Sequence, residues 1–595
     1  MPALAVAIFV VYLRTGAPGA WWGDGLELAC AAKTLGVPHP TGYPLYTVLG
    51  WTAMHVLPWV DPGRALTILS ALACAASAWV AGLLALRWLE GEQGARASGG
   101  ARRTIALAAA AGAMLFWAFA RTIWEHATFA EVYPLTLLLA VALVAVAARP
   151  DSRPRRRAAA LGMLWGLAAL NHYSIVELAP FVVFALLDSS RSPEGRIRAR
   201  AVAANLGSFL AVSSLCLLGY LYLPLRAAAN PPLNWGDPSN LERLLWVLRG
   251  GYFINFDFFA GESRLVSAAK GLQTWLDGWG RQVAPDSLAA LRMPLGCAIA
   301  AGALAGCFLI AKRRPLFGWG LFATLLTSAF VLASYRIRDP EGYVFPAMPA
   351  AFLGWIELVR FGVSRAPALS QRRWLPALVP APAVLLASLH YGAVDKSWDD
   401  GPSRWAAAAL DAAPQGALLI TRERWDSEIF ALWYEQIVHG RRLDVTVYGS
   451  GFIFRGWYRK YFEAAGRPRI PIYVGDRAPE DKTLFDTALI GGVILPNIGS
   501  RRVLVTFQDD VLEKHFSPRR SAILLPRSYY AATAYKLLPP GPFVFELQAP
   551  SRLFSIPPTH DEMLEFFTAM GPEYRRRYLE LSGELTHLGL PAKSP

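Results

Sequence analysis

Two acidic side chains near the N-terminus have the type and spacing to carry chemistry. The segment GDGLELACAAKTLGVPHPTGYPLY places Asp24 and Glu27 three residues apart, which brings both carboxylates to one face of a helix. An apolar stretch precedes them, and acidic residues at a membrane boundary are costly unless they have a function. Proline and glycine then end the helix, so we expect His39, Tyr43 and Tyr46 to fold near the carboxylates. Such a polar, aromatic-lined pocket suits a sugar, with Asp24 as general base.

A structural role for the two acids is the alternative. Asp24 could cap a short helix, and Glu27 could complete a capping box with it. The capping role does not exclude the role of Asp24 as general base, because a capping carboxylate can still face a substrate.

Further candidate residues follow other apolar runs. Each also has a structural alternative: interfacial residues and belt aromatics, a histidine satisfied within the bundle, or an arginine at the headgroup level. Arginine is usually enriched in cytoplasmic loops, however, so an arginine on the outer side is unexpected. Its guanidinium suits bidentate phosphate binding. The segments ARTIWEHATFAEVYPL, LNHYS, YLYLPLRAAANPPLNWGDP and SYRIRDPEGYVFP contribute Arg121, Glu125, His126, Glu131 and Tyr133; Asn171 and His172; Arg226, Asn234, Trp235 and Asp237; and Arg336, Arg338, Asp339 and Glu341.

Composition points to a membrane protein. Of the 595 residues, 54% are hydrophobic and 17% are charged, and mean hydropathy is +0.31, whereas soluble domains carry about 25% charged residues. The net charge of +14 comes from short arginine clusters between apolar runs, a pattern that orients membrane helices and argues against a nucleic-acid partner. The five cysteines form neither a disulfide framework nor a CxxC knuckle.

The apolar runs predict an α-helical multi-pass protein. A spanning helix needs about 20 mainly apolar residues, and fewer inside a bundle. We read the first run as a membrane helix, because no basic residue precedes Arg14 and GAPGA is a poor cleavage site. The eleven predicted spans are 2–20, 64–88, 104–121, 134–148, 158–172, 174–188, 201–225, 294–311, 316–334, 346–361 and 375–391.

Arginine placement predicts the orientation of these spans. The clusters lie in 89–103, 149–157, 188–200, 312–315 and 360–374, and the positive-inside rule makes all five segments cytoplasmic. Two crossings then separate each cluster from the next. The pair within 158–188 requires a break near Asn171–Ser174, which is tolerated at membrane depth where protein or water covers it. The loops that carry the candidate residues would all lie outside.

The C-terminal third differs in kind. Residues 1–391 form the predicted membrane domain, and 392–595 an extracytoplasmic α/β domain. Strand-like runs occur at 417–421, Leu443–Tyr448, 491–495, 502–506 and 521–525, with a helical stretch at 427–439. We find no phosphate-cradling glycine motif there, so binding or scaffolding is the expected role.

Several competing chemistries lack their motifs. The chain holds no HExxH, no GxSxG and no Walker loop. An enzyme at the outer face, where nucleotides are absent, would have to draw an activated substrate from the membrane.

The acidic segment resembles the opening signature of a family of multi-pass proteins. FAEVYPL, GLAALNHYSIV, LYLPLRAAANPPLNWGDP and RDPEGYVFP are similar to its further blocks in the same order, over roughly residues 10–350. The family's animal member is a transmembrane O-mannosyltransferase of plexin-type receptors, and the family is placed among GT-C glycosyltransferases. One departure is that the family's Asp-Ser-Gly-Glu is Asp24-Gly25-Leu26-Glu27 here.

The resemblance implies an activity and a site. Such enzymes pass a sugar from a polyprenyl-phosphate carrier to an acceptor on the extracytoplasmic side, with an acid of the first outer loop as base, here Asp24. We expect inversion at the anomeric carbon and positive charge from Arg226, Arg336 or His172 on the leaving phosphate. The expected substrate-binding residues are His39, Tyr43, Glu125, Glu131, Asn171, His172, Arg226, Trp235, Asp237, Arg336 and Arg338, with Asp24 and Glu27 catalytic.

Other readings remain open. A transporter or flippase of lipid-linked saccharides would share the spans, although inverted repeats with paired broken helices would then be expected. A non-catalytic scaffold predicts that removing 392–595 abolishes all function. The sequence leaves the need for a metal open: Asp24, Glu27, Glu125 and Glu131 could share a divalent ion or hold none. The composition, rich in Ala, Gly, Pro and Arg, favours a bacterial inner membrane. The sequence leaves the acceptor open between a protein and a glycan.

Overall fold

The computed structural model describes residues 1–91, 100–149, 153–192, 194–251, 264–334, 340–365, 381–421, 427–463, 470–476, 481–507, 509–516, 519–521, 544–548 and 559–585. The chain divides into two compact units, and both are discontinuous in sequence. The helical unit comprises Met1–Pro18, Pro40–Tyr222 and Leu248–Trp398, and the sheet unit comprises Gly19–His39, Leu223–Val247 and Asp399–Pro595. The acidic segment thus folds with the C-terminal third.

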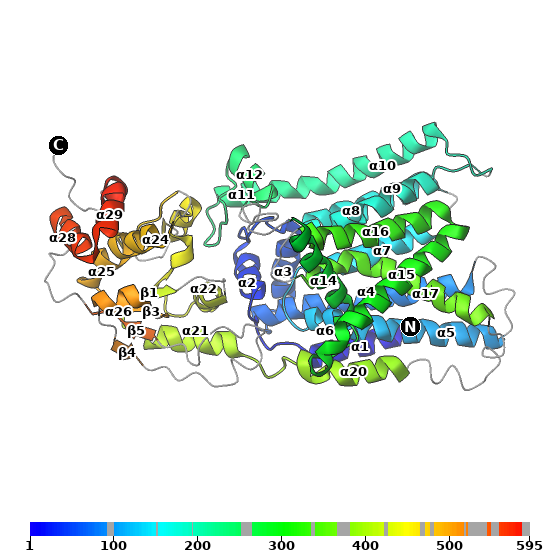
Figure 1. The fold of residues 1–595 in the computed structure, drawn as a ribbon, viewed down its shortest axis with the longest axis horizontal. Coiled ribbons are helices and arrows are strands. Elements are labelled where there is room, and N and C mark those ends of the chain that lie inside the picture. The colour runs from blue at the N-terminus through cyan, green and yellow to red at the C-terminus, as the bar shows by residue number, and fades with distance from the viewer. Residues whose placement is uncertain are drawn as a thin grey trace. The chain divides into compact units, whose positions relative to one another are not determined.

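Long apolar helices build the helical unit (Figure 1). Neighbours pack in pairs, among them α8 with α10, α9 with α16, α4 with α7 and α15 with α17. The helices are α1 (Pro2–Thr15), α3 (Pro44–Val56), α4 (Pro62–Glu90), α5 (Gly100–Phe119), α6 (Arg121–Ala127), α7 (Tyr133–Ala148), α8 (Pro154–Asn171), η1 (Tyr173–Leu178), α9 (Ala179–Asp188), α10 (Ala199–Leu217), η2 (Leu218–Leu221), α14 (Arg264–Arg281), η3 (Asp286–Leu291), α15 (Arg292–Arg313), α16 (Pro315–Ser334), η4 (Gly342–Ala347), α17 (Met348–Arg365) and α20 (Ala381–Val394).

Small residues allow these helices to approach closely. A Cβ atom added at Gly306 of α15 would clash with the backbone of Gly354 on α17, and one at Gly162 of α8 would clash with the backbone of Phe209 on α10. Membrane helices associate through such contacts because lipid offers no hydrophobic driving force between helices. The glycines therefore determine which faces meet.

Five helical stretches among the described residues are long and apolar enough to cross a membrane. A sixth is added if the pair Arg103–Phe119 and Arg121–Ala127, bent by 64°, forms one span. The five are Pro62–Glu90, Ala199–Ala228, Asp286–Arg313, Pro315–Ser334 and Gly342–Arg365, and shorter apolar helices occupy Pro2–Thr15, Tyr133–Ala148 and Ala381–Val394. The chain is a mostly helical, multi-pass type of protein, whereas the count of eleven crossings stays a prediction.

The predicted helix break near Asn171–Ser174 is present in the structure. Helix α8 ends at Asn171, and His172 adopts an extended conformation with φ −157° and ψ 139°. The 3₁₀ helix η1 then begins at Tyr173 and leads into α9. The start of the last predicted span, 375–380, lies outside the described residues.

A five-stranded mixed sheet organises the sheet unit (Figure 1), in the order β2-β1-β3-β5-β4. Strand β1 (Leu418–Thr421) pairs in parallel with β2 (Thr446–Gly449) and β3 (Val503–Val505). Strand β5 (Val544–Glu546) is antiparallel to β3 and to β4 (Arg519–Ser521). Its helices are α2 (Asp24–Thr34), α11 (Tyr222–Ala228), α12 (Leu241–Leu248), α21 (Gly401–Ala412), α22 (Ser427–Trp433), η5 (Tyr434–Val438), η6 (Ser450–Phe452), η7 (Gly456–Tyr458), α23 (Arg459–Glu463), α24 (Lys482–Leu489), η8 (Ile490–Ile494), α25 (Leu495–Ile498), α26 (Asp510–Phe516), α28 (His560–Met570) and α29 (Pro572–Leu585).

One strand prediction is wrong. The run 491–495 lies in η8 and α25, which are helical. Its residues are buried, and an added Cβ at Gly491 would contact Phe567 while one at Gly492 would clash with Tyr473. A short buried apolar run has the same hydrophobic pattern in a helix as in a strand. The runs 417–421 and 502–506 are strands as predicted, the run 443–448 becomes strand at Thr446, and 522–525 lie outside the described residues.

Candidate active site in the sheet unit

Helix α2 begins at the acidic pair. Gly23 precedes it with φ 88° and ψ −149°, a conformation that is accessible mainly to glycine. Asp24 is the first helical residue, and no side chain caps this end. The predicted capping box between Asp24 and Glu27 is therefore wrong, because Gly23 occupies the capping position and Glu27 bonds elsewhere. Both acids still lie in the first turn, where the helix dipole favours negative charge.

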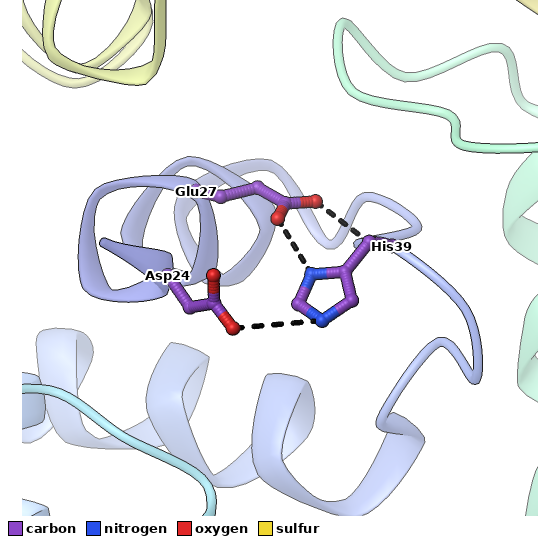
Figure 2. A group of neighbouring side chains, drawn as sticks. All are labelled: Asp24, Glu27 and His39. Carbon is purple, nitrogen blue, oxygen red and sulfur yellow. Dashed lines mark hydrogen bonds and ion pairs between the residues drawn. The ribbon is translucent and has the colours of Figure 1, made fainter. Parts of the chain in front are cut away.

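The imidazole of His39 lies between the two carboxylates (Figure 2). The main-chain N–H of His39 donates to Glu27 Oε1 at 2.7 Å, and its ring Nδ1 is 2.7 Å from Glu27 Oε2. Its Nε2 is 3.6 Å from Asp24 Oδ2. An ionised Glu27 thus favours the proton on Nδ1 and directs Nε2 toward Asp24.

The two acids differ in exposure. The side chain of Asp24 is 37% exposed, whereas that of Glu27 is 1% exposed. Burial raises the pKa of the Glu27 carboxyl, His39 lowers it, and the charge of Asp24 raises it again. Asp24 is therefore the carboxylate that a substrate can reach, and Glu27 is the one that holds the ring.

The same three residues could hold a divalent cation. One ligand atom from each of Asp24, Glu27 and His39 lies within 4.8 Å of the others. Both oxygens of Glu27 already accept from His39, so Asp24 and Nε2 of His39 are the accessible ligands. A carboxylate behind a metal-binding imidazole is a common supporting arrangement.

Helix α2 packs on the C-terminal part of the same unit. It contacts α22 and η5, the Trp21 indole donates to Asp399 Oδ2 at 2.8 Å, and the Trp22 ring lies 6.3 Å from that of Trp405. The position of the acidic pair therefore depends on residues almost 400 positions away in sequence.

Trp235 and Asp237, both predicted to bind substrate, are buried beside this site. Trp235 N donates to Val37 O at 3.0 Å, and the Trp235 ring lies 6.3 Å from that of His39 and stacks on Trp457 at 4.6 Å. Asp237 is fully buried and forms ion pairs with Arg243 and with Lys460, the latter at 2.8 Å. These contacts give both residues a packing role that supports the segment carrying His39.

Arg226 contacts the other end of α2. Its Nε donates to Leu35 O at 2.7 Å and its Nη2 to Thr34 O at 3.1 Å. These carbonyls lack helical partners, and a cation there complements the helix dipole. The residue predicted to bind phosphate thus also has a structural role in holding α2.

Asn234 lies in the sheet unit and donates to Asp237 Oδ1 at 3.2 Å. The remaining predicted residues that the structure describes lie in the helical unit. Tyr43 stacks on His172 at 5.7 Å, with Tyr133 edge-on to the same ring at 4.8 Å. His172 Nδ1 accepts from Ser174 N at 3.1 Å, so a neutral ring carries its proton on Nε2. The histidine and tyrosines form one aromatic cluster, which Tyr343 joins at 5.5 Å.

Asn171 and Glu131 bind backbone near this cluster. Asn171 Nδ2 donates to Val132 O and Thr136 Oγ1, both at 2.9 Å. Glu131 Oε1 accepts from Val132 N at 2.7 Å. Both side chains therefore support the start of α7.

Glu125 lies in a network of ions that sequence reasoning identified only in part. Its carboxylate contacts Arg121 at 3.2 Å, Arg281 at 3.3 Å and Lys396 at 3.8 Å, and Arg281 also pairs with Glu341. Arg281 and Lys396 were missed, although basic residues in segments predicted to be outer could have flagged them. Arg336, Arg338 and Asp339 lie outside the described residues.

The fold is similar to that of solved structures of ArnT. ArnT from Cupriavidus metallidurans in the apo state superposes with a TM-score of 0.50 at 13% identity, covering 88% of this chain and 96% of that one. The same protein bound to undecaprenyl phosphate gives a TM-score of 0.49 at 13% identity, over 92% and 97% of the two chains.

The family resemblance is confirmed over the N-terminal part. Residues 24–194 match the model described as the Protein O-mannosyl-transferase TMEM260 N-terminal domain. The mouse (Mus musculus) Protein O-mannosyl-transferase TMEM260 is 28% identical over 253 residues, which is 41% of this chain. The match spans 32% of the length of the mouse protein.

Proposed function

We infer that this protein is a membrane glycosyltransferase that moves a sugar from a polyprenyl-phosphate carrier to an acceptor hydroxyl, with inversion, at the extracytoplasmic face. The observation that carries the proposal is the set of Asp24, His39 and Glu27, in which only the Asp24 carboxylate is well exposed. The family match supports it, because the first acid of this segment begins the matched region. The mouse relative's name makes mannose the first sugar to test.

Asp24 is the proposed base. It takes the proton of the acceptor hydroxyl as the oxygen forms a bond to the anomeric carbon and the carbon–phosphate oxygen bond breaks. His39 and Glu27 are positioning residues, because they act through Asp24: Nε2 contacts the carboxylate, and Glu27 holds the ring. General-base catalysis typically contributes about 10²–10⁴-fold.

The leaving phosphate needs positive charge rather than a proton. Preorganised charge in a water-poor site is often the largest catalytic contribution. Arg226, Arg336 or His172 is proposed to supply this charge. Arg226 can bind the phosphate while it holds the C-terminal end of α2. Two of its guanidinium N–H groups bind carbonyls at that end, and a guanidinium has five N–H donors in all.

A divalent metal fits the acidic site without being required by this proposal. Asp24 and His39 Nε2 would hold it, and it would supply Lewis-acid stabilisation of an oxyanion. The test is transfer before and after treatment with a chelator, followed by addition of Mg²⁺ or Mn²⁺.

The experiment for the base is the substitution Asp24→Asn in purified protein. We expect transfer from a polyprenyl-phosphate sugar to fall about 10²–10⁴-fold, with unchanged insertion and melting. The matched control is Asp411→Asn, an exposed position at the end of α21, which should leave transfer unchanged. Near-normal transfer by Asp24→Asn would exclude it as the base.

Release of polyprenyl phosphate distinguishes the transferase from a transporter or flippase. The enzyme is expected to release labelled polyprenyl phosphate from the labelled donor, whereas movement of intact donor across a vesicle without release would favour transport.

The proposed topology follows from the arginine clusters. Eleven crossings in residues 1–391 would place the candidate loops and a domain of residues 392–595 in the periplasm of a bacterial inner membrane. Cysteine accessibility at position 24 tests this: labelling from the cytosolic side alone would exclude it.

A further inference from the structure

The sheet unit carries a pocket that is remote in sequence from the acidic pair. Strands β1, β2 and β3 are parallel, so their carboxyl ends meet at one edge of the sheet. Ser450 follows β2 directly, and Phe507 and Asp509 follow β3. Open α/β sheets bind ligands in the crevice outside this edge.

The pocket at this edge has a volume of about 260 Å³. That is slightly smaller than typical small-molecule pockets of about 300–1,000 Å³, so it suits one small ligand. Lys482, Phe485, Asp486 and Leu489 of α24 form one wall, at the spacing of a single helical face. Ser450 and the segment after β3 form the opposite side.

Charged groups occupy one side of the pocket. Lys482 Nζ is 2.6 Å from Asp486 Oδ2 and 3.5 Å from Asp509 Oδ2. Tyr574 donates to Asp486 Oδ2 at 3.3 Å, and Asp509 Oδ1 caps α26 by accepting from Val511 N at 3.0 Å. Two carboxylates face one ammonium, so this side has a negative balance and offers several hydrogen-bond acceptors.

A buried hydroxyl lines the pocket without a partner. Ser450 is 1% exposed, and its Oγ makes no hydrogen bond within the described structure. A buried polar group left unsatisfied is costly, so a ligand that bonds to Ser450 would recover that cost. Phe485, Phe507 and Leu512 supply an apolar surface beside it.

We propose that this pocket binds one neutral sugar ring. A pyranose has an apolar C–H face for Phe485 and Phe507, and hydroxyl groups that donate to Asp486 and Asp509 and bond with Ser450. An anionic ligand would meet the negative balance of the charged side. A wholly apolar ligand would leave the Ser450 hydroxyl without a hydrogen bond. This site does not depend on the proposed transfer reaction.

Saturation-transfer NMR on the full chain tests the proposal. The protein is placed in lipid nanodiscs, because maltoside detergents carry sugars, and the probes are the methyl pyranosides of mannose, glucose and galactose. For so small a ligand we expect a dissociation constant on the order of 1–10 mM. Ser450→Ala and Asp509→Asn should each weaken binding about tenfold, and asparagine can still cap α26.

Three controls make the outcome decisive. Thr568→Val, an exposed change on α28, should leave the signal intact, and melting temperatures should show that both pocket variants fold. Asp24→Asn should also leave the signal intact, so failure of the transferase proposal is recognised separately. The proposal is overturned if no pyranoside binds, if both pocket variants bind normally, if Asp24→Asn removes the signal, or if methylammonium or inorganic phosphate binds in place of the sugars.

Discussion

At the residue scale, the acidic site consists of one exposed carboxylate and a supporting pair. Asp24 is accessible, whereas Glu27 is buried and holds His39 by two contacts. This division could not be predicted from the i, i+3 spacing, which treats the two acids as equivalent. The distinction arises because the chain returns His39 onto α2, and that return depends on the packing of Trp235.

Glu27→Gln is expected to lower kcat about 10- to 100-fold with little change in KM for the donor. Glutamine keeps an acceptor for the main-chain N–H of His39 but removes the charge opposite Nδ1, and hydrogen bonds to charged groups contribute about 1.5–3 kcal/mol. The measurement is steady-state transfer across a pH series. A merely structural role predicts a lower melting temperature with kcat unchanged, and that result would contradict the positioning role.

At the element scale, apolar runs located the helices well, because a membrane helix is defined by its own composition. Helix packing and ion pairs are non-local, so Arg281 and Lys396 could not be assigned to Glu125 from sequence. The strand prediction for 491–495 is wrong because a short buried apolar run has the same hydrophobic pattern in a helix as in a strand. The strands 417–421 and 502–506 were found because turn residues flank them.

Gly306→Leu is expected to destabilise the α15–α17 contact by about 1–3 kcal/mol. The added side chain would overlap the backbone of Gly354, which cannot move without displacing α17. Thermal unfolding in detergent measures the effect. Gly362→Leu on α17 is the control, because nothing lies within 4 Å of its Cβ position; equal melting of the two variants would contradict the packing argument.

Glu428 gives the sheet unit a pH-dependent stability. Burial raises the pKa of its carboxyl to about 7, although a hydrogen bond from Thr506 opposes the shift. The folded state then holds the proton that the unfolded state releases near pH 4.5. Stability from this group is therefore greatest below about pH 4.5 and is lost as the pH rises to about 7.

Glu428→Gln should reduce the loss of stability between pH 4.5 and 7.5 by on the order of 1–3 kcal/mol. Unfolding of the full chain at the two pH values measures it. Glu242→Gln on α12 serves as the control, and an identical pH dependence in wild type and Glu428→Gln would disprove the assignment.

At the scale of the whole molecule, the two-unit division changes what a truncation means. A scaffold would lose all function when residues 392–595 are removed, whereas the sequence-based prediction for an enzyme allows residual hydrolysis of the donor. Helix α2 packs on α22 and η5, so that removal also takes away the support of the acidic pair. The domain predictions treated each domain as one continuous segment, because nothing in local sequence shows that residues 19–39 fold with a distant partner.

A chain that ends at residue 398 is expected to lose both transfer and donor hydrolysis. Its α2 would lose the contacts that bury it, and limited proteolysis should then cut within residues 19–39. Hydrolysis of the donor at the wild-type rate by this shortened chain would show that the acidic site forms without residues 399–595.

The discontinuity of the sheet unit also governs how the protein can be recombined with its relatives. Three separate stretches, Gly19–His39, Leu223–Val247 and Asp399–Pro595, pack as one body. A hybrid that exchanges only the last stretch would set a foreign surface against the native α2. A functional hybrid therefore requires all three stretches from one parent. Substitutions that arise in one stretch during evolution are expected to be accompanied by compensating substitutions in the other two.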